Sequence, residues 1–204
     1  AQGRYKDAYL LNRGTNVFPA ILGRVCDRPC EPVCRRNRVE DEAVAICRLK
    51  RVAADLAGDV RESLPKAPAE KNGKRIACIG AGCASLTVAN DLLPLGYEIV
   101  MFEQYAQTGG LMRTNIPAFR LPAEVLDDEI AMILEMGVDL RLGHRVDSLA
   151  SLLDEDFDAV FVGTGAPRGK ELDLPGRQDS DRIHIGIDWL ESVAFSHTDT
   201  IGEN

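Results

Sequence analysis

The sequence lacks an apolar run of the roughly 18 residues that a membrane span requires. Its first residues, "AQGRYKDAYLLNRGTN", contain no apolar core of a secretory signal. We therefore expect a cytoplasmic protein. An excess of positive charge is also missing: the formal net charge is −8, which gives nucleic-acid binding no electrostatic support. The short basic runs "CRRNR" and "RLKR" are interpreted as solvated faces.

The sequence also lacks a recognisable set of catalytic side chains. The three histidines are scattered and have no partner at metal-ligand spacing, and no Ser–His–Asp or Cys–His pattern is present. The acidic run Asp127, Asp128 and Glu129 is interpreted as the solvated face of a helix rather than as a catalytic pair. We predict no catalytic residue in this chain.

Cysteine, in contrast, is abundant for a chain without a secretory signal, which indicates metal ligation or reactivity rather than disulfides. Three residues separate Cys26 from Cys30 and Cys30 from Cys34, and Cys47 follows after twelve more. A proline in each of the first two gaps prevents a regular helix, so the thiolates can surround one centre. Zinc sites more often use pairs two residues apart. Thiolates suit both metals, and the pattern favours iron–sulfur over zinc.

The pattern of residues along the chain changes near residue 72. Residues 1–25, with a turn at "GTN", and the stretch from residue 42 to 58 are predicted to be helical. The segment "SLPKAPAEKNG" has the composition of a linker. Beyond it, the apolar segments "KRIACIG", "YEIVMFE", "VDLRLG" and "FDAVFV" are predicted strands, the last one buried. Helical patterns separate these segments, with Pro94 shortening one helix. Strands that alternate with helices predict a parallel α/β sheet covered on both faces.

The segment "IACIGAGCAS" predicts a dinucleotide-binding turn. Gly80 and Gly82 stand where a strand passes into a helix, and Ser85 replaces the third glycine of GxGxxG. Glu103 ends the next predicted strand, 23 residues after Gly80, where an acid bonds a ribose hydroxyl. A glutamate there favours a ribose without a 2′-phosphate. The alternative is a glycine-rich turn that binds nothing.

Two further cysteines belong to this region. Cys78 lies inside the predicted strand and is interpreted as a small core residue. Cys83 lies in the turn, where a helix N-terminus lowers thiol pKa values, so a reactive thiol is an alternative there.

The string from residue 80 to 130, with its "TGGLMRTNIPAFRLP" core, closely resembles the glutamate synthase small-subunit family. Relatives of that family include dihydropyrimidine dehydrogenase and the flavin subunits of NAD(P)H-linked iron–sulfur oxidoreductases. The similarity runs from about Asn16 to Trp189. It implies a Rossmann-like domain that binds FAD, preceded by a small α-helical iron–sulfur domain. The implied units are residues 1–72, residues 73–180, and a connection over residues 181–204.

The resemblance also implies which residues contact FAD. The turn holds the pyrophosphate, the acid holds the ribose, the TGGL segment lies beside the flavin, and an arginine contacts the cofactor. A backbone segment meets the adenine, and "VGTGA" forms a second crossing. The implied residues are Gly80, Ala81, Gly82, Ala84, Ser85, Glu103, Gly109, Gly110, Leu111, Arg120, Val146, Gly163 and Gly165. Cys83 replaces the usual proline and Pro94 enters the first helix, but neither change removes a phosphate contact.

For the cysteines, the resemblance is to a helical domain that usually carries two [4Fe–4S] clusters and has an earlier cysteine-rich segment. This chain shows no such segment. The implied ligands of a single [4Fe–4S] cluster are therefore Cys26, Cys30, Cys34 and Cys47. Cys47 lies near the place where some relatives use a different type of ligand.

These features predict a flavin and iron–sulfur electron-transfer module of an NAD(P)H-dependent oxidoreductase. We expect a piece of a longer polypeptide whose NAD(P)H-binding domain is missing here. Such a piece should hold FAD weakly and not oxidise NAD(P)H alone. The expected partner, in a hetero-oligomer, is a larger catalytic subunit or an electron-acceptor protein. The alternative is a non-catalytic scaffold or interaction module with a zinc-bound cysteine site.

Overall fold

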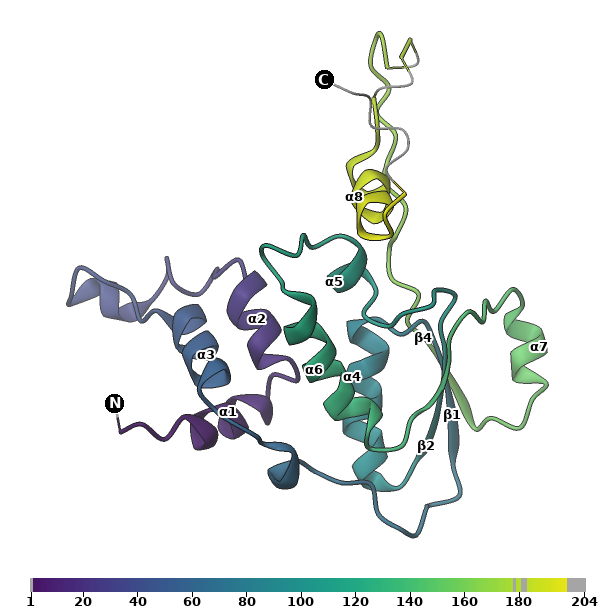
Figure 1. Ribbon diagram of the computed structural model, residues 1–204, viewed down its shortest axis with the longest axis horizontal. Helices are drawn as coiled ribbons and strands as arrows, with labels where there is room; N and C mark the ends of the chain where they lie inside the picture. Colours follow the sequence, from purple (N-terminus) through teal and green to yellow (C-terminus); the bar gives the residue numbers. More distant parts are fainter. Residues whose placement is uncertain (1, 178, 181–182, 198–204) are drawn as a thin grey trace.

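The computed structural model describes residues 2–177, 179–180 and 183–197 (Figure 1). Its centre is a sheet of four parallel strands in the order β3-β2-β1-β4. The strands are β1 Arg75–Ile79, β2 Glu98–Phe102, β3 Asp139–Arg141 and β4 Ala159–Val162. This confirms the predicted α/β class with its parallel sheet. No helix within the described ranges combines the length and apolar character of a membrane span.

Helices lie on both faces of the sheet because successive strand residues point to opposite sides. Ile76 and Cys78 pack with residues of α4 (Cys83–Leu92) and α6 (Ala123–Leu134), whereas Ala77 packs on the other side with Leu152. Leu152 belongs to α7 (Leu149–Leu153), which Figure 1 places beyond the sheet from α4. Cys78 is fully buried, so its interpretation as a core residue is confirmed.

Proline and glycine divide the predicted helices. The turn predicted at "GTN" is confirmed: it separates α1 Tyr5–Arg13, which Gly14 caps, from α2 Pro19–Val25. Pro19 takes the first helical position of α2, where a missing N–H breaks no hydrogen bond. As expected from Pro94, α4 ends at Leu92, and a 3₁₀ turn, η3 Leu93–Leu95, follows it. The other short elements are η1 Arg35–Arg38, η2 Arg61–Ser63 and α5 Leu111–Thr114.

Helix α2 packs on α6, on the side of that helix away from the sheet, and Tyr9 of α1 also contacts α6 (Figure 1). Phe18 and Ile21 belong to the same buried cluster as Leu126, Ile130 and Ile133 of α6. That cluster continues into the sheet through the residues of β1 and β2. The parts of the chain before and after the predicted linker therefore share one hydrophobic core.

The third N-terminal helix, α3 Ile46–Asp55, buries a different face from the one that its apolar spacing suggests. Of the apolar positions at helical spacing, Leu49 and Val52 are exposed and Ala53 is buried, and Cys47, which lies outside that set, is buried as well. A Cβ on Gly23 of α2 would lie 2.8 Å from the Cα of Arg51. The two helices thus touch backbone to backbone where α2 has no side chain, and this contact selects the face.

Strand β4 corrects a prediction. The segment was expected to be a buried strand, but Val162 is 56% exposed. The reason is topological, because β4 pairs only with β1 among the described strands and lies at the edge of the sheet.

The predicted connection over 181–204 contains α8, Gly186–Ala194, which lies beside α5 (Figure 1). The Nδ2 group of Asn115 donates to the Ile187 carbonyl at 2.7 Å. Residues 181–182 and 198–204 lie outside the described residues.

Candidate functional site

The predicted dinucleotide turn joins β1 to α4. Gly80 has a φ of +92°, a conformation that favours glycine, and its N–H donates to the carbonyl of Phe102 at 2.7 Å. A Cβ on Gly80 would lie 2.7 Å from the carbonyl oxygen of Gly163. Any side chain at position 80 would therefore collide with the end of β4.

The TGG segment lies against this turn. The N–H of Gly109 donates to the Ala81 carbonyl at 2.9 Å, and a Cβ on Gly110 would lie 3.0 Å from Gly82 Cα. Gly80, Gly82, Gly110 and Gly163 thus come together from three separate segments, and we call this set the glycine cradle. The structure brings together residues that are more than 80 positions apart in the sequence.

Gly82 differs from the other glycines of the cradle. Its φ is −84°, which any residue can adopt, and a Cβ there would meet nothing closer than Gly110 Cα at 3.8 Å. The fold itself therefore does not require glycine at position 82. The space in front of it is open, in line with a position kept bare for a ligand.

Ser85 and Glu103 flank the cradle. The Ser85 side chain is fully buried, its Oγ has no hydrogen-bond partner among the described residues, and it packs against Gly163. Glu103 is also buried; its Oε2 accepts the Ala81 N–H at 2.8 Å and its Oε1 accepts the Tyr105 N–H at 3.0 Å. The acid at the end of β2 is thus held directly against the turn.

The remaining predicted FAD residues are spread more widely. Leu111 begins α5 next to Gly110, and Ala84 is exposed in the first turn of α4. Arg120 is exposed. Val146 packs on the α7 face of the sheet. Gly165 follows β4 with a φ of +67°, and a Cβ there would have no described neighbour within 4 Å.

The cysteine segment, residues 26–34, begins where α2 ends. Cys26 caps α2, and its Sγ accepts the Arg28 N–H at 3.4 Å. Backbone N–H groups of Val44, Arg36 and Asn37 lower the pKa of Cys34, and the positive charge of Arg36 adds to the effect. Donors around sulfur favour the thiolate, which is the form that ligates metals.

Cys47 has a different environment. Its Sγ lies 3.3 Å from the carbonyl oxygen of Gly23 and 3.6 Å from that of Leu22. In this position the Cys47 S–H group can donate to these carbonyl oxygens. Within the described part of the chain, no group of three or more Cys, His, Asp or Glu side chains is arranged to hold a metal ion. The structure thus does not gather the four cysteines, and their ligation stays a prediction.

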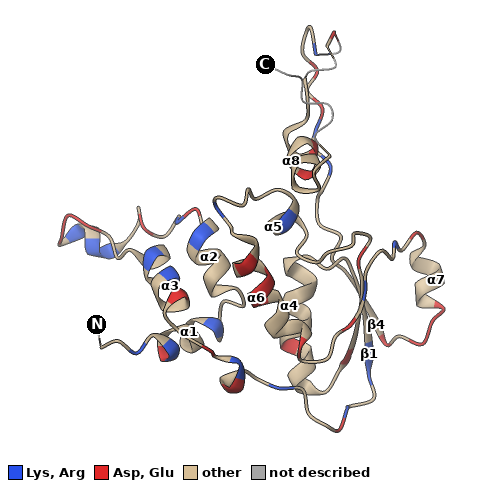
Figure 2. Ribbon diagram, in the orientation of Figure 1, with Lys and Arg blue, Asp and Glu red and all other residues tan. Residues whose placement is uncertain are grey.

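Charge is distributed unevenly around the cysteine segment. Figure 2 shows basic residues on η1 and α3 and acidic residues on α6, which faces α2. The arginines of η1 are exposed, in agreement with their interpretation as a solvated face. Two acids of α6 are exposed too: Asp127 pairs with Arg113, and Asp128 pairs with Arg61.

The run Asp127, Asp128 and Glu129 was expected to form the solvated face of a helix. For Glu129 this expectation is wrong, because its side chain is only 1% exposed. It lies three residues after Leu126 and four before Ile133, on the apolar face of α6. The helical spacing of the apolar residues therefore indicated a buried position for Glu129. The prediction of an exposed residue rested on the charge of its side chain instead. Glu129 is therefore a buried polar residue that sequence reasoning missed.

Comparison with known proteins identifies the relatives of this chain. Residues 1–62 match a family model described as dihydropyrimidine dehydrogenase domain II, 4Fe-4S cluster. The glutamate synthase [NADPH] small chain of Bacillus subtilis is 33% identical over 201 residues, which cover 98% of this chain and 40% of that protein. The NADPH-Fe(3+) oxidoreductase subunit beta of Geobacter sulfurreducens is 33% identical over 98% of this chain and 30% of its own length.

A third relative is the NAD-dependent dihydropyrimidine dehydrogenase subunit PreT homolog of Salmonella typhi, 35% identical over 92% of this chain and 45% of that protein. The chain spans less than half the length of each of these relatives. Each relative is an oxidoreductase or dehydrogenase chain, and the similarity covers both the cysteine segment and the glycine cradle. The chain belongs to the family of glutamate synthase small chains and dihydropyrimidine dehydrogenase-like proteins.

Proposed function

We propose that this chain is the FAD- and [4Fe–4S]-binding part of an NAD(P)H-dependent oxidoreductase. In this role it passes electrons between a nicotinamide cofactor, FAD and the cluster. The observation that carries the proposal is the glycine cradle, with its open space at Gly82 and the N-terminus of α4 behind it. FAD supplies the exchange between two-electron and one-electron chemistry that such a chain needs.

The residues around the cradle suit a dinucleotide in several independent ways. Unpaired N–H groups at the start of α4 favour phosphate oxygens. The Ser85 hydroxyl is buried and unpartnered among the described residues, so it has a hydrogen bond to offer. Glu103 is fixed beside the turn by two backbone N–H groups, and its remaining lone pairs suit ribose hydroxyls.

For the cluster, the cysteine segment meets the chemical requirement only in part. Cys26 and Cys34 receive N–H donors, as cluster sulfurs do, and Cys30 is exposed and accessible. Cys47 does not meet it, because its sulfur faces carbonyl oxygens. We therefore propose Cys26, Cys30 and Cys34 as ligands, and the iron content of a Cys47→Ser protein decides whether Cys47 joins them.

The nicotinamide site and the partner are proposed from the relatives. Two of their names specify NADPH and one specifies NAD, and two are called small or beta subunits. We place NAD(P)H binding in the part of such proteins that this chain does not span. A larger catalytic subunit or an electron-acceptor protein is the proposed partner.

A pair of glycine substitutions tests FAD binding without confusing it with folding. Gly82→Ala should leave the melting temperature nearly unchanged, since φ is ordinary and space is available. It should weaken FAD binding by about tenfold or more, because the new methyl group keeps a pyrophosphate away from the backbone. FAD affinity is measured by titration, and stability by thermal denaturation.

Gly80→Ala is the contrasting variant, because its Cβ would collide with Gly163 and its φ is left-handed. It should lose stability whether or not FAD is present. Equal FAD affinity in Gly82→Ala and the parent chain would refute the proposed site. A protein that contains zinc and no flavin after anaerobic purification would favour the scaffold alternative instead.

A further inference from the structure

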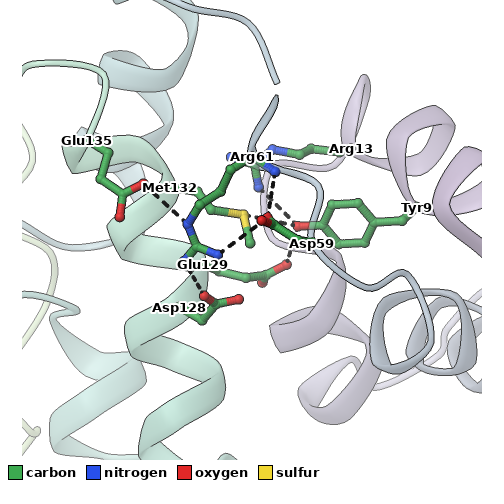
Figure 3. A network of polar contacts seen from close by, with 8 residues as sticks. All are labelled: Tyr9, Arg13, Asp59, Arg61, Asp128, Glu129, Met132 and Glu135. Atoms are coloured by element: carbon green, nitrogen blue, oxygen red, sulfur yellow. Dashed lines mark hydrogen bonds and ion pairs between the residues drawn. The ribbon is translucent and has the colours of Figure 1, made fainter. Parts of the chain in front are cut away.

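Glu129 receives hydrogen bonds from two elements that precede it by more than 100 residues. Its Oε1 accepts the Tyr9 hydroxyl at 3.2 Å and the Ala20 N–H at 2.8 Å, and its Oε2 accepts the Ile21 N–H at 3.0 Å. Figure 3 shows Tyr9 pointing at Glu129 from the N-terminal helices, with Arg13 behind it. One buried carboxylate of α6 therefore holds both α1 and α2.

These bonds use both oxygens of the Glu129 carboxyl group as acceptors. The first N–H groups of a helix have no partner inside the helix, and burial without a partner is costly. Ala20 and Ile21 donate to different oxygens of Glu129. A glutamine has one acceptor oxygen, so its NH₂ group would face one of these donors.

Helix α2 transmits this attachment to the cysteine segment. It spans seven residues, or about 10 Å, and Cys26 follows it directly. The Cys26 N–H still donates to the Leu22 carbonyl at 3.2 Å, so Cys26 continues the helical pattern. Fixing the start of α2 therefore fixes where the cysteine segment begins.

Helix α6 carries the same attachment to the glycine cradle. Leu126 precedes Glu129 by three residues and lies on the same side of α6. A Cβ on Gly109 would lie 3.4 Å from Leu126 Cδ2, and Gly109 is hydrogen-bonded to Ala81 in the turn. Helix α6 thus lies against Gly109, the residue next to Gly110 of the cradle, at one turn and contacts α2 at the next.

We infer that Glu129 is a positioning residue that fixes the cysteine segment relative to the glycine cradle. The consequence rests on the proposed function: if the cradle binds FAD and the cysteines bind the cluster, Glu129 sets the separation of the two cofactors. A carboxyl group does this better than an apolar contact, because two directed hydrogen bonds from consecutive N–H groups specify the position and rotation of α2, and a third holds α1.

The inference is tested first without cofactors. Nitroxide labels are attached to the exposed thiols of Cys30 and Cys83 in a full chain that carries Cys26→Ser and Cys34→Ser. Glu129→Gln should broaden the distance distribution between the labels and speed amide exchange at Ala20 and Ile21 by about tenfold or more. Exchange in β1 and β2 should accelerate much less than exchange at Ala20 and Ile21, because the expected loosening is local to the start of α2. The control is Asp128→Asn, which removes the neighbouring exposed charge and should change neither measurement.

Unchanged distances and unchanged exchange in a folded Glu129→Gln protein would overturn the inference. Loss of the sheet together with α2 would overturn it as well, because Glu129 would then supply general stability rather than placement. In the chain with all its cysteines, loaded with FAD and iron, photoreduction of FAD with EDTA as electron donor gives a second readout. Glu129→Gln should slow the following reduction of the cluster by about threefold or more at unchanged cofactor content. A failure to load either cofactor would refute the proposed function, while the distance measurement would still decide the role of Glu129.

Discussion

Single residues give the cysteine segment its sharpest test, since Cys34 and Cys47 have opposite surroundings. Cys34→Ser should lose most of the bound iron, because the N–H donors around its sulfur favour a ligating thiolate. Cys47→Ser should keep its iron, since a serine hydroxyl can donate to the same carbonyls of Leu22 and Gly23. Iron per chain is measured after anaerobic purification. A folded Cys47→Ser protein without iron would restore the four-cysteine assignment.

The same contrast shows what residue-level prediction from sequence can achieve. The turn at Gly80 and the contact of Glu103 with it were predictable because a strand–turn–helix motif fixes the local backbone, while their role in FAD binding stays a prediction. The position of Cys47 depends on how α2 packs against α3, and spacing alone holds no information about that packing. The helical spacing placed Glu129 on the buried face of α6, but its partners, Tyr9 and the start of α2, are distant in the sequence, so no local signal identified them.

At the scale of elements, the contact between α6 and α2 should depend on pH. Burial raises the pKa of Glu129, although N–H groups of Ala20 and Ile21, the charge of Arg13 and the Tyr9 hydroxyl oppose the shift. The folded protein thus holds the Glu129 proton more tightly than the unfolded chain does. This contribution to stability is complete below the ordinary glutamate pKa of about 4.3 and is lost as pH rises through the raised value.

Urea unfolding of the parent chain and of Glu129→Gln, over a series of pH values, measures this effect. The free energy of unfolding of the parent should fall relative to that of Glu129→Gln as pH rises through this window. The side chains of Asp55, Glu124 and Asp128 line one cavity together with Glu129. The matched control is therefore Asp128→Asn, which should leave the pH-dependent difference in place. A difference that rises with pH would show that the hydrogen bonds to Glu129 outweigh its burial.

Element types were predictable where the sequence determines them locally. Alternating strands and helices indicated the parallel sheet, and Pro94 marked the end of α4. The exposure of β4 and the buried face of α3 were not predictable in the same way. The first depends on strand order and the second on a backbone contact at Gly23. Both depend on how different elements pack against each other, and the residue pattern within a single element does not reveal that packing.

At the scale of the whole molecule, the shared core predicts one cooperative unfolding transition. Ile21 is 1% exposed and lies in the cluster that joins α2, α6 and the sheet. Ile21→Ala should lower the free energy of unfolding by about 2–5 kcal/mol, because it leaves a cavity in that cluster. Leu49→Ala, at a site 58% exposed, should change it by no more than about 0.5 kcal/mol.

Amide exchange in β1 and β2 of Ile21→Ala should accelerate together with exchange in α2, although the substitution lies far from the sheet in the sequence. If the sheet of Ile21→Ala kept its parent stability while the N-terminal helices melted earlier, the two predicted domains would have separate cores, and the attachment at Glu129 would be a contact between them rather than a part of one rigid body.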